Sequence, residues 1–427
     1  MFGIVISLWL IAITLLVLFQ PALGPVAYYL IVWMHPEEQM YGGLSLRWTF
    51  LIALTSLIGF LFMGKGRQVP KSSLVIFVIL LMLWYFASAL VNDVTDEEFS
   101  LATDFAKVVL MSLITACVMN TRARIHTLIW IIVISIGMVS LRTGLITIVS
   151  AGGAVVIGPD FLGHTNEYAR FVIYTWPLMI FLSRHSAHYY VRVGFAALSV
   201  ISVLALIGTN SRGAFVAFAA MCGVLWLFQN KKIRIALLAS LLAMGAYFAA
   251  PEKRMESFSN RAATIENADE DTSFVGRTEA WVFGWDYALD HPIFGGGPNI
   301  FERVHKTASH SNYFEVLGET GFVGLTIYGV IAILAFATIL RIRKLTKGIP
   351  DLIWAHDLAF FIMISLVGYF VGGLVKNHGF NEYYYMLLGI LMGTEVAVRN
   401  YLIAHADGER QNVDSSAKNA PAQVYRN

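Results

Sequence analysis

The stretch His291-Pro292-Ile293-Phe294-Gly295-Gly296-Gly297-Pro298 lies within residues 251–321, the one long polar segment between two runs of membrane-length hydrophobic sequence. Proline and glycine at this density are typical of turns. The same segment concentrates basic side chains. They include Arg254, Arg261, Arg277, Arg303, Lys306 and His310. We therefore expect apolar helices to form a platform, with this segment and the loop ends beside it holding the chemistry.

The composition of the 427-residue chain excludes a soluble globular protein, because 57% of its residues are hydrophobic and only 14% are charged. Soluble domains are about 45–50% apolar and about 25% charged. The apolar residues gather in runs of roughly 15–24, close to the ~20 that a helix needs to cross a bilayer. Cys117 and Cys222 lie inside such runs, where we expect small core residues rather than a disulfide.

The apolar runs predict twelve membrane spans, which the Lys and Arg content of the short loops orients. Basic loops, placed in the cytoplasm, alternate with acidic ones such as residues 92–104. We take residues 2–34 as one crossing kinked at Pro21, with both termini inside. Thirteen spans with the N-terminus outside are the alternative. The predicted spans are 2–34, 48–63, 74–91, 105–119, 127–149, 167–183, 193–209, 213–228, 235–250, 321–340, 352–375 and 384–404.

On this topology residues 251–321 lie on the extracytoplasmic side of the membrane. The basic residues there run against the usual cytoplasmic bias of Lys and Arg, and an anionic ligand at the outer interface explains them. The expected organisation is a helical region over 1–250, a large loop domain with short interfacial helices over 251–320, further helices over 321–404, and a disordered cytoplasmic tail over 405–427.

Three arginines near the outer ends of spans are candidates for anion binding. Arg212 lies in a short turn, where a planar guanidinium suits bidentate contact with phosphate, although it can also snorkel to lipid headgroups. Arg142 lies deeper in its span, where an unpaired charge is costly and marks a functional candidate. Arg170 follows Glu167 at helical i, i+3 spacing, so an ion pair between the two is its structural explanation.

Residues 275–289 predict an amphipathic helix along the outer membrane interface. Trp281, Trp285 and Ala288 fall on one face of this helix, and Arg277 stands in its first turn. There the guanidinium can contact headgroups or reach inward to an anion.

Residues 309–319 predict a second short helix, with Ser309 as its N-cap. His310 then stands in the first turn, where the helix dipole favours a bound anion and a neutral imidazole. A neutral histidine beside a phosphate site is a candidate general base. A lone histidine is more commonly structural. Glu315 and Glu319 on the following turns make the surroundings of His310 polar, which favours a functional role.

Several common catalytic motifs are missing from the sequence. It has no Gly-rich phosphate loop ending in Lys-Ser/Thr, no His-Glu-x-x-His and no Gly-x-Ser-x-Gly. Asp269-Glu270-Asp271 superficially matches the metal-binding triplet of nucleotide-sugar glycosyltransferases, but three acids in a solvated loop need no metal. We expect neither a metal nor another cofactor.

Four motifs together resemble the bacterial O-antigen ligase/polymerase superfamily over roughly residues 200–405. They are Asn210-Ser211-Arg212-Gly213, Gly276-Arg277 followed by Trp281, the 291–298 turn, and His310-Ser311-Asn312-Tyr313 with Glu319-Thr320-Gly321-Phe322-Val323-Gly324. Trp33-Met34-His35-Pro36 resembles the N-terminal extension of ligase-type members. The resemblance implies an all-α, GT-C-like integral membrane protein with about twelve transmembrane helices and one large periplasmic loop, in the inner membrane of a Gram-negative bacterium.

Ligases of this superfamily transfer a polysaccharide from undecaprenyl diphosphate to lipid A-core, with inversion and without a metal. By resemblance, Arg212 and Arg277 hold the donor diphosphate and His310 activates the acceptor hydroxyl. Supporting candidates outside that correspondence are Arg142, Arg170, Arg261, Arg303 and Glu319. The expected partners are the lipid-linked donor, the lipid A-core acceptor and membrane lipids, without nucleic acid.

Three alternatives stay open at this stage. A repeat-unit polymerase or a protein O-oligosaccharyltransferase of the same superfamily uses the same donor with another acceptor. A transporter of anionic lipid-linked glycans also needs external arginines. Such a transporter calls for charged or broken helices near the midplane, and apart from Arg142 the predicted spans are apolar.

Overall fold

A computed structural model of the chain describes residues 2–36, 46–63, 68–149, 165–209, 211–228 and 272–418. In these ranges the chain forms helices joined by loops, and seven of the helices are long and apolar enough to cross a membrane. Four shorter apolar helices accompany them. The protein is therefore an all-α membrane protein, and the number of twelve crossings stays a prediction.

Most predicted spans coincide with helices, because a bilayer admits only segments that satisfy their own backbone hydrogen bonds. The predicted span 235–250 lies outside the described residues. The helices are α1 (Phe2–Phe19), α2 (Leu23–Met34), α3 (Trp48–Met63), α4 (Ser73–Val91), α5 (Asp96–Val118), α6 (Arg122–Val149), α7 (Thr165–His185), α8 (Tyr189–Thr209), α9 (Arg212–Phe228), α12 (Thr272–Asp290), α13 (Asn312–Thr346), α14 (Ile353–Gly372) and α15 (Glu382–Lys418), with a π-helical turn η4 (Phe301–His305) and a 3-10 turn η5 (Pro350–Leu352).

The break predicted at Pro21 separates α1 from α2. The amide N–H of Leu23 donates to the carbonyl of Gln20 (2.9 Å), which closes a turn between the two helices. Helix α3 packs against both. A single kinked crossing by residues 2–34 stays a prediction.

The predicted acidic loop 92–104 is wrong from Asp96 onward, where α5 begins. The hydroxyl of Thr95 accepts from the amide of Glu98 (3.3 Å), and the Glu98 carboxylate accepts from the amide of Thr95 (3.0 Å). This capping box, followed by an acidic first turn, starts a helix in a segment too polar for a hydropathy scan to include.

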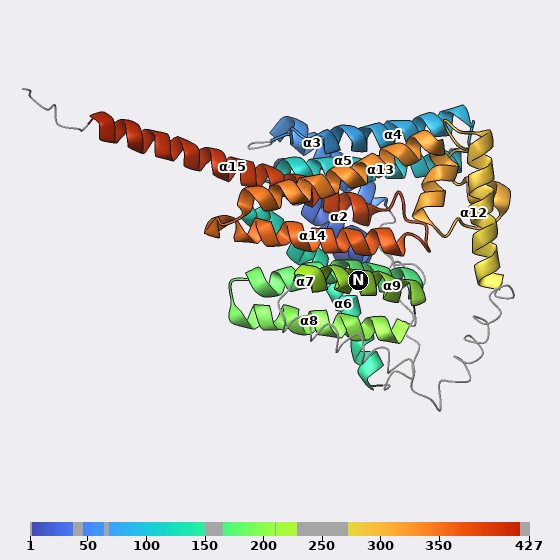
Figure 1. Cartoon of the computed structure of the whole chain (residues 1–427), viewed down its shortest axis with the longest axis horizontal. Coiled ribbons are helices and arrows are strands. Elements are labelled where there is room, and N and C mark those ends of the chain that lie inside the picture. The colour runs from blue at the N-terminus through green and yellow to red at the C-terminus, as the bar shows by residue number, and fades with distance from the viewer. Residues whose placement is uncertain are drawn as a thin grey trace, which may run out of the picture.

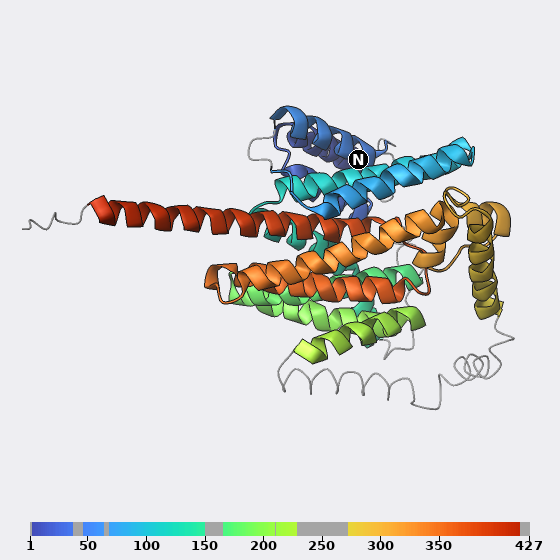
Figure 2. The ribbon, with the colours of Figure 1, turned by 45° about the horizontal axis from the view of Figure 1, so that its top comes forward.

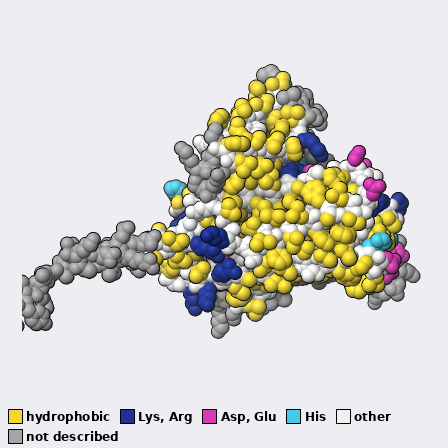
Figure 3. Space-filling model, turned by 90° about the horizontal axis from the view of Figure 1, so that it is seen from above, with side chains coloured by type: hydrophobic (Ala, Val, Ile, Leu, Met, Phe, Trp, Pro, Cys, Tyr) yellow, Lys and Arg dark blue, Asp and Glu magenta, His cyan; other side chains and the backbone are white. Residues whose placement is uncertain are grey.

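Most helices lie side by side in one bundle, and α12 crosses its end (Figure 1). The loops that precede α13 and follow α14 lie at this same end. At the opposite end α15 projects far beyond the other helices (Figure 2). Its backbone is helical to Lys418, past residue 405 where the disordered tail was expected. Hydrophobic side chains cover the middle of the face in Figure 3, and charged ones gather toward its two ends.

Helix α7 is the most enclosed part of the bundle. It packs against α6, α8, α9 and α14, and Tyr168, Tyr174 and Phe181 on it are buried. Because protein surrounds it, α7 carries Arg170 and Pro177 without exposing them to lipid. The two cysteines are buried and free, as predicted.

The 291–298 turn packs its backbone directly on the backbone of α13, which kinks at Gly321 (φ 68°). The amide of Gly296 donates to the carbonyl of Gly318 (2.8 Å), and the amide of Phe322 donates to that of Pro292 (2.9 Å). A Cβ on Gly295, whose φ is +64°, would lie 2.6 Å from the Gly318 carbonyl oxygen. We call residues 291–298 with 318–322 the glycine clasp.

Helix α4 holds the glycine clasp from the side. The Ser88 hydroxyl lies 2.5 Å from the Phe294 carbonyl and 2.6 Å from that of Glu319. The Trp84 indole donates to the Thr320 carbonyl (3.0 Å). The clasp therefore fixes where the first turns of α13 stand relative to α4.

Candidate active site

His310 stands just before α13 in a left-handed backbone conformation (φ 50°). The helix begins at Asn312, and Ser311 is its N-cap. The prediction that Ser309 caps the helix and that His310 lies in its first turn was therefore wrong. A left-handed residue cannot continue a helix, and it is uncommon outside glycine.

The backbone on both sides of His310 is anchored. The Trp281 indole on α12 donates to the carbonyl of Ser309 (3.0 Å), and the Trp281 ring stacks on Phe314. The Ser309 hydroxyl donates to the carbonyl of Ser311 (3.1 Å). Both serines are 2% exposed, whereas His310 is half-buried. The structure thus holds this imidazole on a fixed backbone.

Three cations lie near enough to His310 to act on its charge: Lys376, Arg277 and Arg170, which we call the basic cluster. Burial lowers the pKa of His310 first, and the three positive charges lower it further. Glu167 acts in the opposite direction and raises it. The imidazole is therefore neutral at neutral pH and is free to accept a proton.

Different parts of the fold deliver the cluster. Arg170 comes from α7, Arg277 from the first turns of α12, and Lys376 from the loop between α14 and α15. Lys376 forms an ion pair with Glu167. The expected pair between Arg170 and Glu167 is absent, and Arg170 is buried (4% exposed) with its Nε and Nη1 unpartnered.

The two guanidinium groups remain open to an anion. Within the described part of the chain, no carboxylate lies within ion-pair distance of Arg170 or Arg277. A buried charge without a partner is strongly destabilising, so an anionic ligand gains from entering here. Arginine forks match the geometry of phosphate oxygens.

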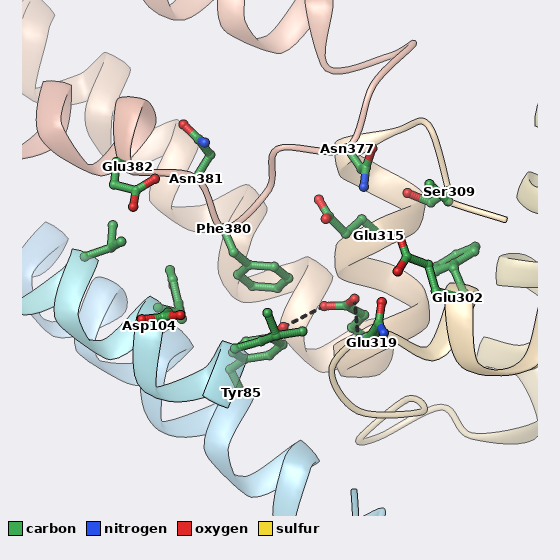
Figure 4. Close-up of a pocket in the computed structure, with 16 residues that line it drawn as sticks. Tyr85, Asp104, Glu302, Ser309, Glu315, Glu319, Asn377, Phe380, Asn381 and Glu382 are labelled. Atoms are coloured by element: carbon green, nitrogen blue, oxygen red, sulfur yellow. Dashed lines mark hydrogen bonds between the residues drawn. The ribbon is translucent and has the colours of Figure 1, made fainter. Parts of the chain in front are cut away.

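A cavity of about 280 Å³ beside the His310 loop is lined by carboxyl groups. Glu315 and Glu319 face it from α13, and the stacked rings of Tyr85 and Phe380 (4.2 Å) lie between them and Asp104 and Glu382, whereas Glu302 lies on their own side (Figure 4). The other acids that line it are Asp104, Glu302 and Glu382. The residues that line this cavity include no lysine or arginine, so an anionic substrate is better placed at the basic cluster. Among the described residues, no set of His, Cys, Asp or Glu is arranged to hold a metal ion.

Residues 197–329 match a family model described as O-antigen ligase. This match supports the O-antigen ligase/polymerase superfamily that the sequence motifs resemble. Its members are glycosyltransferase-like enzymes. Residues 1–187 match a family of unknown function, DUF5935, and no curated protein matches the chain.

The superfamily match covers α9, α12, the glycine clasp and His310. Arg170 and Lys376, which complete the basic cluster, lie outside residues 197–329. The fold, rather than the matched segment alone, therefore assembles the basic cluster.

Three predicted arginines lie elsewhere or beyond the described side chains. Arg212 is the first residue of α9, and its side chain is not among those described. Arg261 lies outside the described residues. Arg142 is exposed on α6, beside the exposed Leu141 and Leu145.

Two further candidates hold the structure around the clasp. Arg303 pairs with Glu98 (2.9 Å) and donates to the Gly296 carbonyl. Glu319 accepts from the Tyr85 hydroxyl (2.8 Å) and from the Asn299 amide (2.9 Å). Neither side chain is directed at the His310 imidazole by these contacts.

Sequence reasoning missed the role of the loop between α14 and α15. This loop brings Lys376 beside His310 and places His378 close to Arg170. One signal was present, since Lys376 is a basic residue on the predicted outer side. The ion pair between Lys376 and Glu167 could not be predicted from residue spacing, because the two residues are far apart in the sequence.

Proposed function

We propose that this protein is an O-antigen ligase, an inverting glycosyltransferase that moves a polysaccharide from undecaprenyl diphosphate to lipid A-core in the periplasm. The observation that carries the proposal is a neutral, half-buried His310 near three cations, two of which are arginines without an ion-pair partner among the described residues. A base and an anion site thus stand side by side, as transfer from a diphosphate donor requires.

In the proposed reaction the acceptor hydroxyl gives its proton to His310. The oxygen of the acceptor hydroxyl attacks the anomeric carbon of the donor sugar from the face opposite the diphosphate. The bond from that carbon to the phosphate oxygen breaks. The bonding electron pair goes to the diphosphate. The guanidinium groups of Arg277 and Arg170 stabilise this charge, and the family resemblance assigns Arg212 and Arg277 to this role.

The basic cluster also links the strength of the base to the presence of the donor. Without donor, three positive charges hold the pKa of His310 down. Donor phosphates bring negative charge beside the imidazole and raise its pKa again. His310 therefore becomes an effective base when the donor is bound, which limits proton transfer to unproductive acceptors.

The decisive experiment uses purified full-length protein in nanodiscs, undecaprenyl-diphosphate-linked O-antigen, lipid A-core and EDTA. We expect ligated lipopolysaccharide, and loss of turnover in EDTA would contradict metal independence. Longer lipid-linked glycan would identify a polymerase, and glycosylated added protein would identify an O-oligosaccharyltransferase. Movement of unmodified glycan across a proteoliposome membrane, with no transfer product, would identify a transporter.

Paired variants separate chemistry from folding. His310→Ala should lose transfer but still bind the donor, because the arginines are retained. His291→Ala is the matched control, since His291 is exposed and its ring contact is with Tyr287. Full turnover by His310→Ala would refute the assignment of the base.

A further inference from the structure

The loop between α14 and α15 is buried where it passes the start of α13. Gly379 in this loop is buried, and His378 is partly buried. Most loops run over a protein surface, where water satisfies their peptide groups. A buried peptide group must instead find a partner inside the protein. The peptide groups of His378 and Gly379 therefore depend on the helices around them.

Two side chains at the start of α13 accept from the amides of these loop residues. The amide of His378 donates to the side-chain oxygen of Asn312 (2.6 Å). The amide of Gly379 donates to the carboxylate of Glu315 (2.7 Å). The amide of Asn312 itself donates to the carbonyl of Gly373, the first residue of the loop (2.8 Å). The start of α13 therefore holds the loop at two places.

Two buried tyrosines donate to the carbonyl groups of the same loop residues. The hydroxyl of Tyr369 on α14 donates to the carbonyl of His378. The hydroxyl of Tyr385 on α15 donates to the carbonyl of Gly379 (3.1 Å). Every peptide N–H and C=O of His378 and Gly379 thus has a side-chain partner, and three helices fix this part of the backbone. We define the loop clamp as Asn312, Glu315, Tyr369 and Tyr385.

The loop clamp connects the backbone of the candidate base to the backbone of a cation. Asn312 follows His310 by two residues, and its partner His378 follows Lys376 by two residues. The hydrogen bond between Asn312 and His378 therefore ties the two short segments together. The side chain of Lys376 is held separately, by its ion pair with Glu167.

We propose that Asn312 and Glu315 are positioning residues for the transfer reaction, which act by holding Lys376 in place relative to His310. This inference rests on the proposed function, because it assigns His310 as the base. Neither residue needs to touch a substrate for this role. Their effect should pass entirely through the position of Lys376.

The charges that act on His310 make this role measurable. Arg277 on α12, with Arg170 and Glu167 on α7, also acts on the pKa of His310. Of these four charged residues, Lys376 is the one that the loop carries. Lys376 lowers the pKa of His310. Release of the loop should therefore raise this pKa, while the contributions from α7 and α12 remain.

The test follows the titration of His310 by NMR, in full-length protein with ¹³C-labelled histidines in nanodiscs. The His310 signal is the one that His310→Ala lacks. Glu315→Ala should raise the titration midpoint by about one pH unit, the size of effect that a single nearby charge produces. Loss of a carboxylate alone would lower the pKa of a histidine, so a rise cannot come from the missing charge. An unchanged or lower midpoint would overturn the proposal.

Two milder variants show whether the effect depends on the hydrogen bonds of the loop clamp. Glu315→Gln keeps an oxygen that can accept from the Gly379 amide, so its midpoint should equal that of the wild-type protein. Tyr385→Phe removes one hydroxyl and keeps the packed ring, and it tests the proposal even if Glu315→Ala does not fold. It should raise the midpoint by a smaller amount. The absence of any rise in Tyr385→Phe would overturn the proposal.

A double variant tests whether Glu315 acts through Lys376. Lys376→Met should raise the midpoint, and adding Glu315→Ala to it should raise the midpoint no further. Additive shifts would overturn the proposal. Glu302→Ala is the matched control, because Glu302 is an exposed carboxylate that lines the same cavity as Glu315. A rise in this control equal to that of Glu315→Ala would also overturn it.

Glycan transfer by the same variants separates the loop clamp from the proposed function. The acid limb of kcat/KM for the donor should move to higher pH in Glu315→Ala and in Lys376→Met, because a base with a higher pKa is protonated at higher pH. A limb that stays at the wild-type pH would contradict a role in the reaction. If the His310 titration shifts as expected but the wild-type protein transfers no glycan, the proposed function fails and the loop clamp stands.

Discussion

Lys376 forms an ion pair with Glu167, the acidic residue one helical turn before Arg170 on α7. The pair fastens the loop after α14 to the start of α7. It also takes the carboxylate that sequence spacing assigns to Arg170, whose Nε and Nη1 are left without a hydrogen-bond partner. This ion pair therefore positions Lys376, and it leaves Arg170 without a direct carboxylate partner among the described residues.

Glu167→Gln should move the pH dependence of transfer toward acid. Glu167 raises the pKa of His310, so removing its charge lowers that pKa further. Since the base must be neutral, activity should persist to lower pH than in the wild-type protein. The measurement is the acid limb of kcat/KM for the donor, and a shift toward alkaline pH would contradict the assignment.

The wild-type protein should show two different acid limbs. The limb of kcat/KM reports the free enzyme, in which the pKa of His310 lies below its usual value near 6.5. The limb of kcat reports the donor complex, in which phosphates raise that pKa. We expect the kcat limb at the higher pH, and coincident limbs would show that the donor phosphates do not lie beside His310.

Arg277→Ala should lower kcat by about 10²–10³-fold, the usual cost of losing one donor to a developing anion. Arg277→Lys should recover part of the loss, because the charge returns without the guanidinium fork. Arg122→Ala is the matched control, since Arg122 is exposed at the start of α6. If Arg277→Ala turned over donor as fast as the control does, the assignment of Arg277 to the site would be wrong.

Gly295→Ala should unfold at a markedly lower temperature than the wild-type protein. The new Cβ would lie 2.6 Å from both the Gly318 carbonyl oxygen and the Gly321 amide nitrogen, which are backbone atoms that cannot turn away. Gly348→Ala separates this clash from backbone strain, because Gly348 also has positive φ (81°) but a Cβ there would meet open space. The free energy of unfolding of the control should fall by about 1–3 kcal/mol at most. An equal fall in both variants would show that the close packing of the glycine clasp does not stabilise the fold.

The helices were predictable where the bilayer itself imposes a pattern. Apolar runs located α3, α4 and α9 closely, because no other structure buries such a run in lipid. The start of α5 was missed, since Thr95 and Glu98 build its cap from polar residues. The start of α13 was misplaced, because the left-handed conformation of His310 leaves no signature in residue type.

The sequence pointed to several residues of the candidate site but not to the contacts among them. His310 and Arg277 stood out as polar residues next to turns on the outer side. Arg170 was noticed, but its lack of a partner depends on Lys376, more than two hundred residues away, reaching Glu167 first. Arg303 carried the same charge signal and is instead paired with Glu98. Residue type indicates charge, and only the fold decides which charges are already neutralised.

The indole of Trp281 connects the candidate base, His310, to the helix that carries Arg277. Trp281 and Arg277 lie one turn apart on α12, and the indole N–H grips Ser309, the neighbour of His310. A tilt of this crosswise helix would carry the proton acceptor and the guanidinium away together. On the proposed mechanism, such a tilt would take the base and the guanidinium away from the donor at the same time.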